Sequence, residues 1–354
     1  MVADRFSDVN RDRVTLCRSR RTHMRRFFIL ASAVTLIASS AVAADTTNRT
    51  FDATYTATIT NIPADAGVLD IWIPLPRARS AQGITDVKID SPYQWQRFTE
   101  KEFGNEYAVA KIPAPQAGEL VVKVSFRGTR SAIAMEKIAG VTPSKSEIAR
   151  ALRADRMVTL SPRVKKLSDE IVAGKTTTVD KALAIYEYVM TTMKYDKTTP
   201  GWGNGDTERA CDIKAGNCSD FHSLFISLAR SQKIPARFVI GFPLPQGDGR
   251  IPSYHCWAEF YVEGKGWIPV DASDASKSSD PAVRAMLFGN LPPNRVEFTM
   301  GRDLVLTPAT SEPLNFFIYP RVETKGKPVG TASLSLEVRD VKGGTNIAAG
   351  GDVH

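Results

Sequence analysis

The chain has 354 residues, of which 43% are hydrophobic and 24% are charged, and its formal net charge at pH 7 is +8. This length allows one large domain or two to three domains of ordinary size, and the apolar content is enough to build their cores. The basic residues form no continuous stripe, so the composition argues against a nucleic-acid-binding protein.

The first 43 residues have the pattern of a leader. Met24-Arg25-Arg26 precedes an apolar run at 27–38, and Ala41-Val42-Ala43 follows the small-residue pattern of a cleavage site. We therefore predict an N-terminal extension, a signal peptide at 24–43, and a secreted or periplasmic mature protein. The apolar run is too short to span a bilayer, so we expect no membrane span after cleavage; an uncleaved anchor is the alternative. Residues 1–43 carry 8 Lys and Arg and 3 Asp and Glu, so their removal would lower the net charge from +8 to +3.

Residues 45–130 have the pattern of an all-β domain. Alternating or β-branched runs are separated by proline and glycine, and they predict strands at 50–60, 68–73, 84–89, 107–112 and 120–127. We expect a β-sandwich with Trp72 and Trp95 in its core. Its expected role is spacing or substrate presentation rather than chemistry.

Helix signals follow this region. A short helix is predicted at 146–154. Ser161 then begins a helix that ends near Gly174, and Thr177 begins the next, in a capping-box pattern. We expect these last two helices to pack on the helix that begins at Cys218.

A glycine-rich, charged loop at 194–215 lies where a lid or a substrate cleft would be expected. Trp202 lies between Gly201 and Gly203 and would have few neighbours to pack on in such a loop. Its indole N–H could donate to an oxyanion, or its ring could line an acyl cleft. A tryptophan that only packs is the alternative.

Cys218 is the candidate nucleophile. Gly216 and Asn217 are turn residues, and apolar residues follow at helical spacing, namely Phe221, Leu224, Phe225 and Leu228. Cys218 should therefore lie in the first turn of a buried helix, where partial positive charge and free N–H groups favour a thiolate and can hold an oxyanion. The alternative is a buried cysteine that only fills space.

A thiolate nucleophile needs a proton acceptor, and His255 is the candidate. It belongs to a predicted strand at 254–262, with 267–271 as the partner strand. A three-residue loop containing glycine would bring Asp271 onto the face of His255, whereas a four-residue loop would turn it away. Pro269 lacks a ladder donor, so this strand should lie at an edge or carry a bulge. In the first register, Asp271 would orient the imidazole.

Four segments resemble the bacterial transglutaminase-like superfamily: Gly216-Asn217-Cys218-Ser219-Asp220, Ile234-Pro235-Ala236-Arg237, His255-Cys256-Trp257-Ala258-Glu259 and Gly266-Trp267-Ile268-Pro269-Val270-Asp271. The resemblance covers about 180–275 and implies a papain-like core with a Cys-His-Asp triad at Cys218, His255 and Asp271. The expected fold is α+β: a transglutaminase core made of a helical lobe and an antiparallel sheet, with an N-terminal all-β sandwich domain. The superfamily contains transamidases, peptidases, amidases and inactive members, so the resemblance does not fix the reaction.

Other residues could support this site. Trp257 is a further candidate to line the substrate cleft. His222 lies one helical turn after Cys218 and has no evident carboxylate partner, which favours a supporting role over that of the base. Glu259 shares a strand face with His255 and could support it, or could be a solvated strand residue.

The chain after the leader contains three cysteines, an odd number for an oxidising compartment. Cys211 and Cys256 could form a disulfide that leaves Cys218 free; three buried thiols are the alternative. Zinc binding is the main chemical rival, because these cysteines, His222 and His255 are suitable ligand types. Their spacing is unusual for zinc, and adjacent strand residues point to opposite faces, so we expect no metal or other cofactor.

The C-terminal part is predicted to contain a helix at 279–288 and strands at 296–300, 304–306, 315–319 and 334–339, which finish the core sheet or dock on the β-domain. The expected order is a leader at 1–43, a β-sandwich at 45–130, a connector at 131–160, a catalytic core at 161–290, C-terminal strands at 291–340 and a disordered Gly/Ala-rich tail at 341–354.

The predicted function is that of an exported cysteine-type enzyme that transfers acyl groups from peptide or carboxamide bonds through a thioester. Water as acceptor would make it a peptidase or amidase, and an amine would make it a protein-glutamine transamidase. Its expected partner is a protein or peptide substrate in the cell envelope. A non-catalytic binding module of the cell envelope and a zinc-binding protein are the alternatives.

Overall fold

The computed structural model describes residues 48–115, 118–138 and 140–341. The predicted signal peptide and, apart from its first residue, the predicted tail lie outside the described residues. Across the described part, no helix is long and apolar enough to cross a membrane. Antiparallel sheets and several helices make up the chain, which confirms the predicted α+β class.

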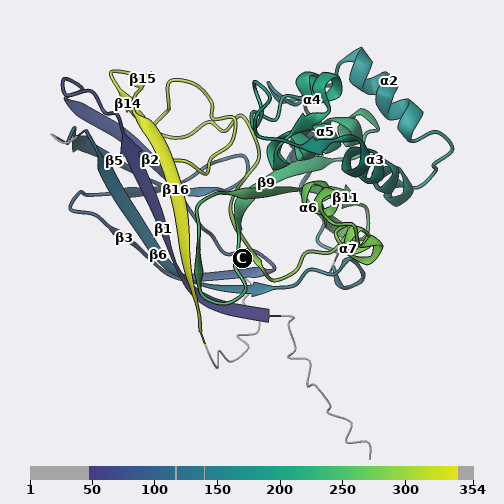
Figure 1. The fold of residues 1–354 in the computed structure, drawn as a ribbon, viewed down its shortest axis with the longest axis horizontal. Helices are drawn as coiled ribbons and strands as arrows, with labels where there is room; N and C mark the ends of the chain where they lie inside the picture. Colours follow the sequence, from purple (N-terminus) through teal and green to yellow (C-terminus); the bar gives the residue numbers. More distant parts are fainter. Residues whose placement is uncertain (1–47, 116–117, 139, 342–354) are drawn as a thin grey trace, which may run out of the picture. The chain divides into compact units, whose positions relative to one another are not determined.

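Two five-stranded antiparallel sheets form the β-rich part (Figure 1). In β1 (Asn48–Thr60), every second residue from Phe51 to Ile59 is buried, the period expected when one face of a strand covers a core. Inward residues of both sheets belong to one hydrophobic cluster, as in a β-sandwich. The first sheet has the order β10-β16-β1-β6-β3, with β3 (Gln82–Asp90), β6 (Leu120–Ser131), β10 (Gly249–Ile251) and β16 (Thr331–Asp340). The second has the order β15-β14-β2-β5-β4, with β2 (Val68–Leu75), β4 (Gln96–Thr99), β5 (Glu106–Pro113), β14 (Arg321–Thr324) and β15 (Lys327–Pro328).

These two sheets take strands from well beyond the predicted β-domain at 45–130. The predicted strand at 334–339 is β16, which pairs with β1 along its length. β14 pairs with β2, and β10 pairs with β16. Of the strands predicted at 291–340, the one at 296–300 is therefore part of the core sheet, as β13 (Arg295–Met300), and the one at 334–339 is part of the β-rich part. By their internal contacts, the described residues form one compact unit.

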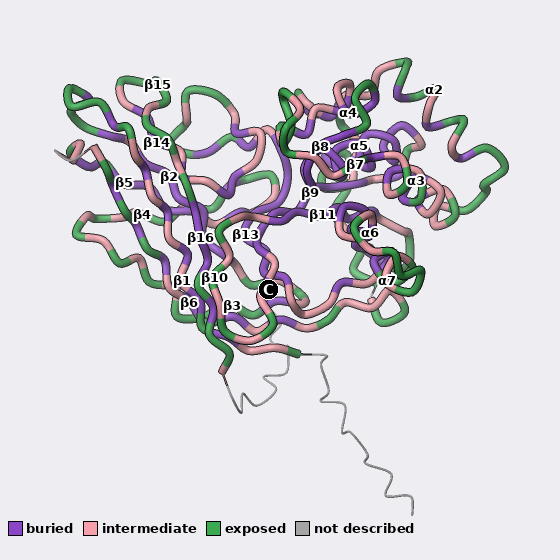
Figure 2. Tube along the Cα trace, in the orientation of Figure 1, coloured by how far each residue is buried: buried purple, intermediate pink, exposed green. Residues whose placement is uncertain are grey.

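A smaller sheet of order β12-β11-β9-β13 lies under the helical lobe. All residues of α5 (Cys218–Ser231) are buried, and α5 packs on β9 and β11 (Figure 2). As predicted, α2 and α3 pack on α5. The strands are β9 (Ala236–Pro243), β11 (His255–Val262), β12 (Gly266–Val270) and β13 (Arg295–Met300). The remaining elements are a 3-10 helix (Met135–Lys137), α1 (Lys145–Leu152), α2 (Pro162–Ile171), α3 (Thr178–Thr192), β7 (Lys194–Tyr195), α4 (Thr207–Ile213), β8 (Ala215–Gly216), α6 (Ala272–Lys277) and α7 (Pro281–Met286).

Two predicted strands, at 304–306 and 315–319, are wrong. The segment between β13 and β14 is irregular and holds one isolated bridge, between Leu304 and Leu314. Side chains of the second sheet bind its backbone instead; the indole of Trp72, for example, donates to a carbonyl of this segment at 2.9 Å. Its buried apolar residues Leu304, Leu306, Leu314 and Phe317 have no neighbouring strand to pair with.

Side chains join the β-rich part to the core sheet and the irregular segment. The amide of Gln82 exchanges two hydrogen bonds with the backbone of Glu297 in β13, at 2.8 and 2.9 Å. Arg79 pairs with the carboxylate of Glu297 at 2.7 Å. The hydroxyl of Tyr55 donates to the carbonyl of Ile318 at 2.9 Å. β13 is therefore held by groups from outside its own sheet.

We expect Tyr55→Phe to lower the free energy of unfolding by about 1–1.5 kcal/mol, because the buried carbonyl of Ile318 loses its donor. Urea denaturation measures this change. Tyr261→Phe, at a partly exposed tyrosine, is the matched control and should change the value by less than about 0.5 kcal/mol. Equal losses of the free energy of unfolding in the two variants would contradict a stabilising hydrogen bond from Tyr55 to Ile318.

Candidate active site

Cys218 is the first residue of α5, as the sequence predicts. The side chain of Asn217 caps the helix by accepting from the N–H of Ser219 at 2.8 Å, and the carboxylate of Asp220 accepts from the N–H of Asn217 at 2.9 Å. Gly216 lies so close to this carboxylate that a Cβ would collide with it. These capping bonds do not involve the N–H of Cys218, which lies at the positive end of the helix dipole.

The carboxylate of Asp220 also anchors the glycine-rich loop. It accepts from the N–H of Gly203 at 2.7 Å and from the N–H of Gly205 at 3.1 Å. The buried guanidinium of Arg302 holds a carbonyl of the same loop at 3.2 Å. Trp202 is carried by this tethered loop and remains 39% exposed. The position of Asp220, three residues after Asn217, is the capping-box signal that could have predicted its role.

A cavity of about 220 Å³ lies beside Cys218. The loop, the start of α5 and two tyrosine-bearing segments contribute its lining, which consists of Tyr195, Lys197, Trp202, Gly203, Asn204, Asn217, Cys218, Ser253, Tyr254 and Tyr319. Trp202 therefore lines the same cavity as the sulfur, as expected for one of its predicted roles.

The hairpin of β11 and β12 brings His255 and Asp271 together. Val262 pairs with Gly266, so the loop has three residues, and Gly264 within it has a φ of 76°. This is the left-handed residue that such a loop needs. The predicted register is confirmed, and Nε2 of His255 lies 2.7 Å from Oδ2 of Asp271.

The carboxylate of Asp271 is fully buried and has several partners. Its Oδ1 accepts from the N–H of Asp274 at 3.0 Å, which caps α6. Nη2 of Arg295 lies 3.2 Å from Oδ2 of Asp271 and 2.5 Å from the carboxylate of Asp274. Burial alone would raise the pKa of Asp271, but the charges of His255 and Arg295 hold that pKa well below its ordinary value.

His255 connects this carboxylate to the sulfur. Because Asp271 occupies Nε2, Nδ1 is the nitrogen left for the hydrogen bond that His255 shares with Cys218. Burial lowers the pKa of His255, but the carboxylates of Asp271 and Asp274 outweigh it and raise that pKa to about 10. Burial would raise the pKa of Cys218, yet hydrogen bonds from Cys256 and His255 and the imidazolium charge bring it well below its ordinary value. A thiolate–imidazolium pair is therefore favoured near neutral pH.

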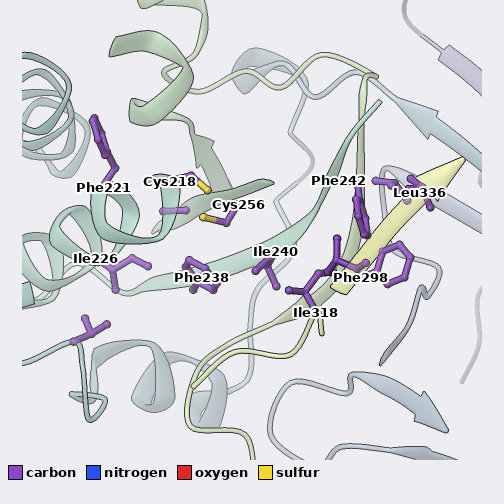
Figure 3. Packing of buried hydrophobic residues seen from close by; sticks show 14 of the residues in the cluster. Cys218, Phe221, Ile226, Phe238, Ile240, Phe242, Cys256, Phe298, Ile318 and Leu336 are labelled. Carbon is purple, nitrogen blue, oxygen red and sulfur yellow. The ribbon is translucent and has the colours of Figure 1, made fainter. Parts of the chain in front are cut away.

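Cys256 places a second thiol beside Cys218 (Figure 3). Burial and the neighbouring thiolate raise the pKa of Cys256 well above its ordinary value, so it stays protonated and donates to Cys218. Its sulfur also lies 3.8 Å from the hydroxyl of Ser219. The three cysteines of the described residues are free, so the predicted disulfide between Cys211 and Cys256 is wrong. Cys211 lies on α4, whereas Cys256 faces the start of α5.

His222 supports the backbone of Cys218. Its Nδ1–H donates to the carbonyl of Cys218 at 2.8 Å, across the first turn of α5. Burial lowers the pKa of His222 despite the nearby carboxylate of Asp271, so the ring is neutral near pH 7. The expectation that His222 lacks a carboxylate neighbour is wrong, since its Nε2 lies 3.6 Å from Asp271.

The sequence of this region matches a known family. Residues 165–272, which include Cys218, His255 and Asp271, match the model of the transglutaminase-like superfamily. These residues form a transglutaminase-like domain.

The transglutaminase-like chain is similar to proteins from several bacteria. An uncharacterized protein of Haemophilus influenzae is 28% identical over 306 residues, which cover 75% of this chain and 83% of that protein. The crystal structure of a "Putative Cysteine Protease from Cytophaga hutchinsonii" has a TM-score of 0.60 at 17% identity, covering 84% of this chain and 93% of that one. The periplasmic domain of TgpA from Pseudomonas aeruginosa has a TM-score of 0.34 at 16% identity, covering 62% and 88%. The likeness to the Cytophaga structure shows that the fold extends over most of the chain.

Two residues predicted to lie near the transglutaminase-like site lie elsewhere. Trp257 is fully buried in a cluster with Val239, Leu291 and Met300, so it does not line the cleft. Glu259 is also buried and pairs with Arg237 at 2.6 Å, so it neither supports His255 nor faces solvent.

The predicted zinc alternative finds no support in the transglutaminase-like core. Among residues 48–115, 118–138 and 140–341, the group whose ligand atoms lie close enough to hold a metal ion consists of His255, Asp271 and Asp274. It contains no cysteine, and the guanidinium of Arg295 already binds both of its carboxylates. A cation in this place would have to displace that guanidinium.

Sequence reasoning missed two residues of the site. The hydroxyl of Tyr254 accepts from the side-chain amide of Asn217 at 2.9 Å and lies 3.2 Å from the hydroxyl of Ser219. The only feature of the sequence that could have pointed to Tyr254 is its position directly before His255. Arg295 had no local signal, because it lies on a different strand and reaches Asp271 through the order of the sheet.

We expect iodoacetamide at pH 6 to alkylate Cys218 much faster than Cys211 or Cys256. The pKa of Cys218 is lowered, so its thiolate persists as the pH falls, whereas burial raises the pKa of the other two thiols. Peptide mapping by mass spectrometry measures the three rates. His255→Ala should slow the reaction of Cys218 at pH 6 by about tenfold for each unit by which its pKa rises. Similar rates at the three cysteines, or no effect of His255→Ala, would contradict the ion pair.

Proposed function

We propose that the protein is an exported cysteine-type enzyme that transfers acyl groups from peptide or carboxamide bonds through a Cys218–His255–Asp271 triad. The observation that carries this proposal is the continuous set of contacts from Asp271 through His255 to Cys218, with the sulfur facing a cavity. A thiolate, an oriented acid–base group and space for a substrate are the parts that nucleophilic catalysis requires.

In the first half-reaction, the thiolate of Cys218 attacks the carbonyl carbon of the bound amide. A C–S bond forms as the carbonyl π electrons move to oxygen. When the tetrahedral adduct collapses, the C–N bond breaks and the imidazolium of His255 gives its proton to the leaving nitrogen. The products are a thioester on Cys218 and a free amine, with His255 neutral.

In the second half-reaction, a water molecule or an amine attacks the thioester carbon. Neutral His255 takes a proton from the attacking group, and the C–S bond breaks to return the thiolate. Asp271 keeps Nε2 protonated in both steps and stabilises the imidazolium whenever it forms. Water as acceptor gives hydrolysis, and an amine gives transamidation.

The oxyanion needs donors near the sulfur. The N–H of Cys218 lies at the helix start and is outside the capping bonds, so it is the first donor. The second donor that we propose is the indole N–H of Trp202, which lines the same cavity on a loop tethered to α5 through Asp220. Tethering supports this role because an oxyanion donor must be fixed before the reaction.

The proposed location is the periplasm or the exterior of the cell. The leader pattern at 24–43 supports export, and the proposed substrate is therefore a protein or peptide of the cell envelope.

We expect Cys218→Ala to abolish turnover of peptide amide substrates, whereas Cys211→Ala, at a buried cysteine on α4, keeps most of the activity. Rapid acid quenching followed by intact-protein mass spectrometry should detect an acyl adduct on Cys218 and identify the acyl group. Release of free acid or of an amine conjugate then distinguishes the two acceptors. Unchanged turnover in Cys218→Ala would exclude the triad, and a protein that binds peptides equally with or without Cys218 and never forms the adduct would be a binding module.

We expect Trp202→Phe to lower kcat about 10²- to 10³-fold, because phenylalanine keeps an aromatic ring at the cavity but removes the indole N–H. Steady-state kinetics with a chromogenic amide measure kcat, and KM reports whether the aromatic ring at position 202 still binds the substrate. Trp95→Phe in the β-rich part is the matched control. A variant with normal kcat and raised KM would assign Trp202 to binding alone.

A further inference from the structure

The cavity beside Cys218 carries one charged side chain besides the sulfur, and this side chain is the ammonium group of Lys197. The other lining residues are aromatic, amide, hydroxyl or glycine residues. Nζ of Lys197 lies 5.8 Å from the ring centroid of Tyr195, and among the described residues it has no carboxylate within ion-pair distance. Lys197 is exposed, so its charge is available to a ligand that enters the cavity.

The carboxylates around this cavity are already occupied by other groups. Asp274 pairs with Lys277 at 2.8 Å as well as with Arg295. Asp196, next to Lys197 in sequence, accepts from the backbone of its own turn, and Asp220 is buried behind the loop. None of these carboxylates lines the cavity, so the charge that a ligand meets there besides the sulfur is the ammonium of Lys197, which favours an anionic ligand group.

The cavity is placed to hold the acyl side of the substrate. His255 must face the leaving nitrogen to protonate it, yet His255 is not among the residues that line the cavity, whereas Cys218 is. The leaving group therefore lies on the His255 side, and the acyl group lies in the cavity. The volume of about 220 Å³ is below that of pockets for drug-sized ligands and suits a short peptide segment.

We propose that this cavity selects acyl donors that carry a carboxylate, which Lys197 binds while the rings of Trp202, Tyr254 and Tyr319 enclose the rest of the acyl group. The inference rests on the proposed acyl transfer at Cys218. The carboxylate can come from the side chain of an α-linked glutamyl residue or from the main chain of a γ-linked one. Both place a negative charge a few bonds from the reacting carbonyl.

Three chromogenic donors test this proposal: N-acetyl-α-glutamyl p-nitroanilide, its γ-linked isomer and the neutral N-acetyl-glutaminyl p-nitroanilide. We expect kcat/KM to favour at least one anionic donor over the neutral donor by about fivefold, the upper range for an exposed ion pair. The preferred isomer identifies the source of the carboxylate. A kcat/KM that is equal for all three donors would overturn the proposal.

Lys197→Gln should remove this preference, and Lys197→Glu should invert it in favour of the neutral donor. Lys194→Gln is the matched control, because Lys194 is an exposed lysine three residues away that does not line the cavity. We expect Lys194→Gln to keep the wild-type preference. A preference that survives both substitutions of Lys197, or that is lost in Lys194→Gln to the same extent, would contradict the assignment of Lys197.

Binding to the Cys218→Ala protein separates this inference from the proposed function. Isothermal titration calorimetry with the same three donors measures affinity without turnover. Tighter binding of an anionic donor that depends on Lys197, in a native protein that forms no thioester, would uphold the anionic cavity and reject the enzyme. Turnover without any charge preference in either kinetics or binding would uphold the enzyme and reject the anionic cavity.

Discussion

The buried carboxylate of Asp271 is the group on which the site depends. A carboxylate with no exposure is costly unless charges and hydrogen bonds compensate for lost water. Here His255, Arg295 and the N–H of Asp274 supply that compensation. The same carboxylate ends β12 and caps α6, so the charge that orients the imidazole also fixes where the strand stops and the helix begins.

Asp271 follows β12, one edge strand of the core sheet, and side chains of the β-rich part hold β13, the opposite edge strand. Arg295 begins β13, and Glu297, two residues later, is bound by Gln82 and Arg79 from the β3 region. The groups that hold β13 thus also hold the guanidinium that neutralises Asp271. This gives the first sheet a structural role in the site, beyond the spacing or presentation role expected from the sequence.

Local signals in the sequence were enough to predict the centre of the fold. Turn residues before an apolar run placed Cys218 at a helix start, the three-residue loop set the hairpin register, and Pro269 marked β12 as the edge strand that it is. The errors concern contacts between distant segments. The sequence does not say what covers each face of a sheet, so Trp257 was assigned to the cleft rather than to a packed cluster. Similarly, Leu304 and Leu306 are buried by side chains from another sheet and not by a neighbouring strand.

β1 and β16 lie close to the two ends of the described chain and pair with each other, so that Phe51 lies opposite Asp340. β1 has β6 on its other side, so the first sheet is incomplete until β16 has been synthesised. Pairings of such long range also form slowly, because a large loop must close before they gain any stabilising contact. Folding of the first sheet therefore ends with the closure of β16 on β1, after local pairs such as β11 with β12 have formed.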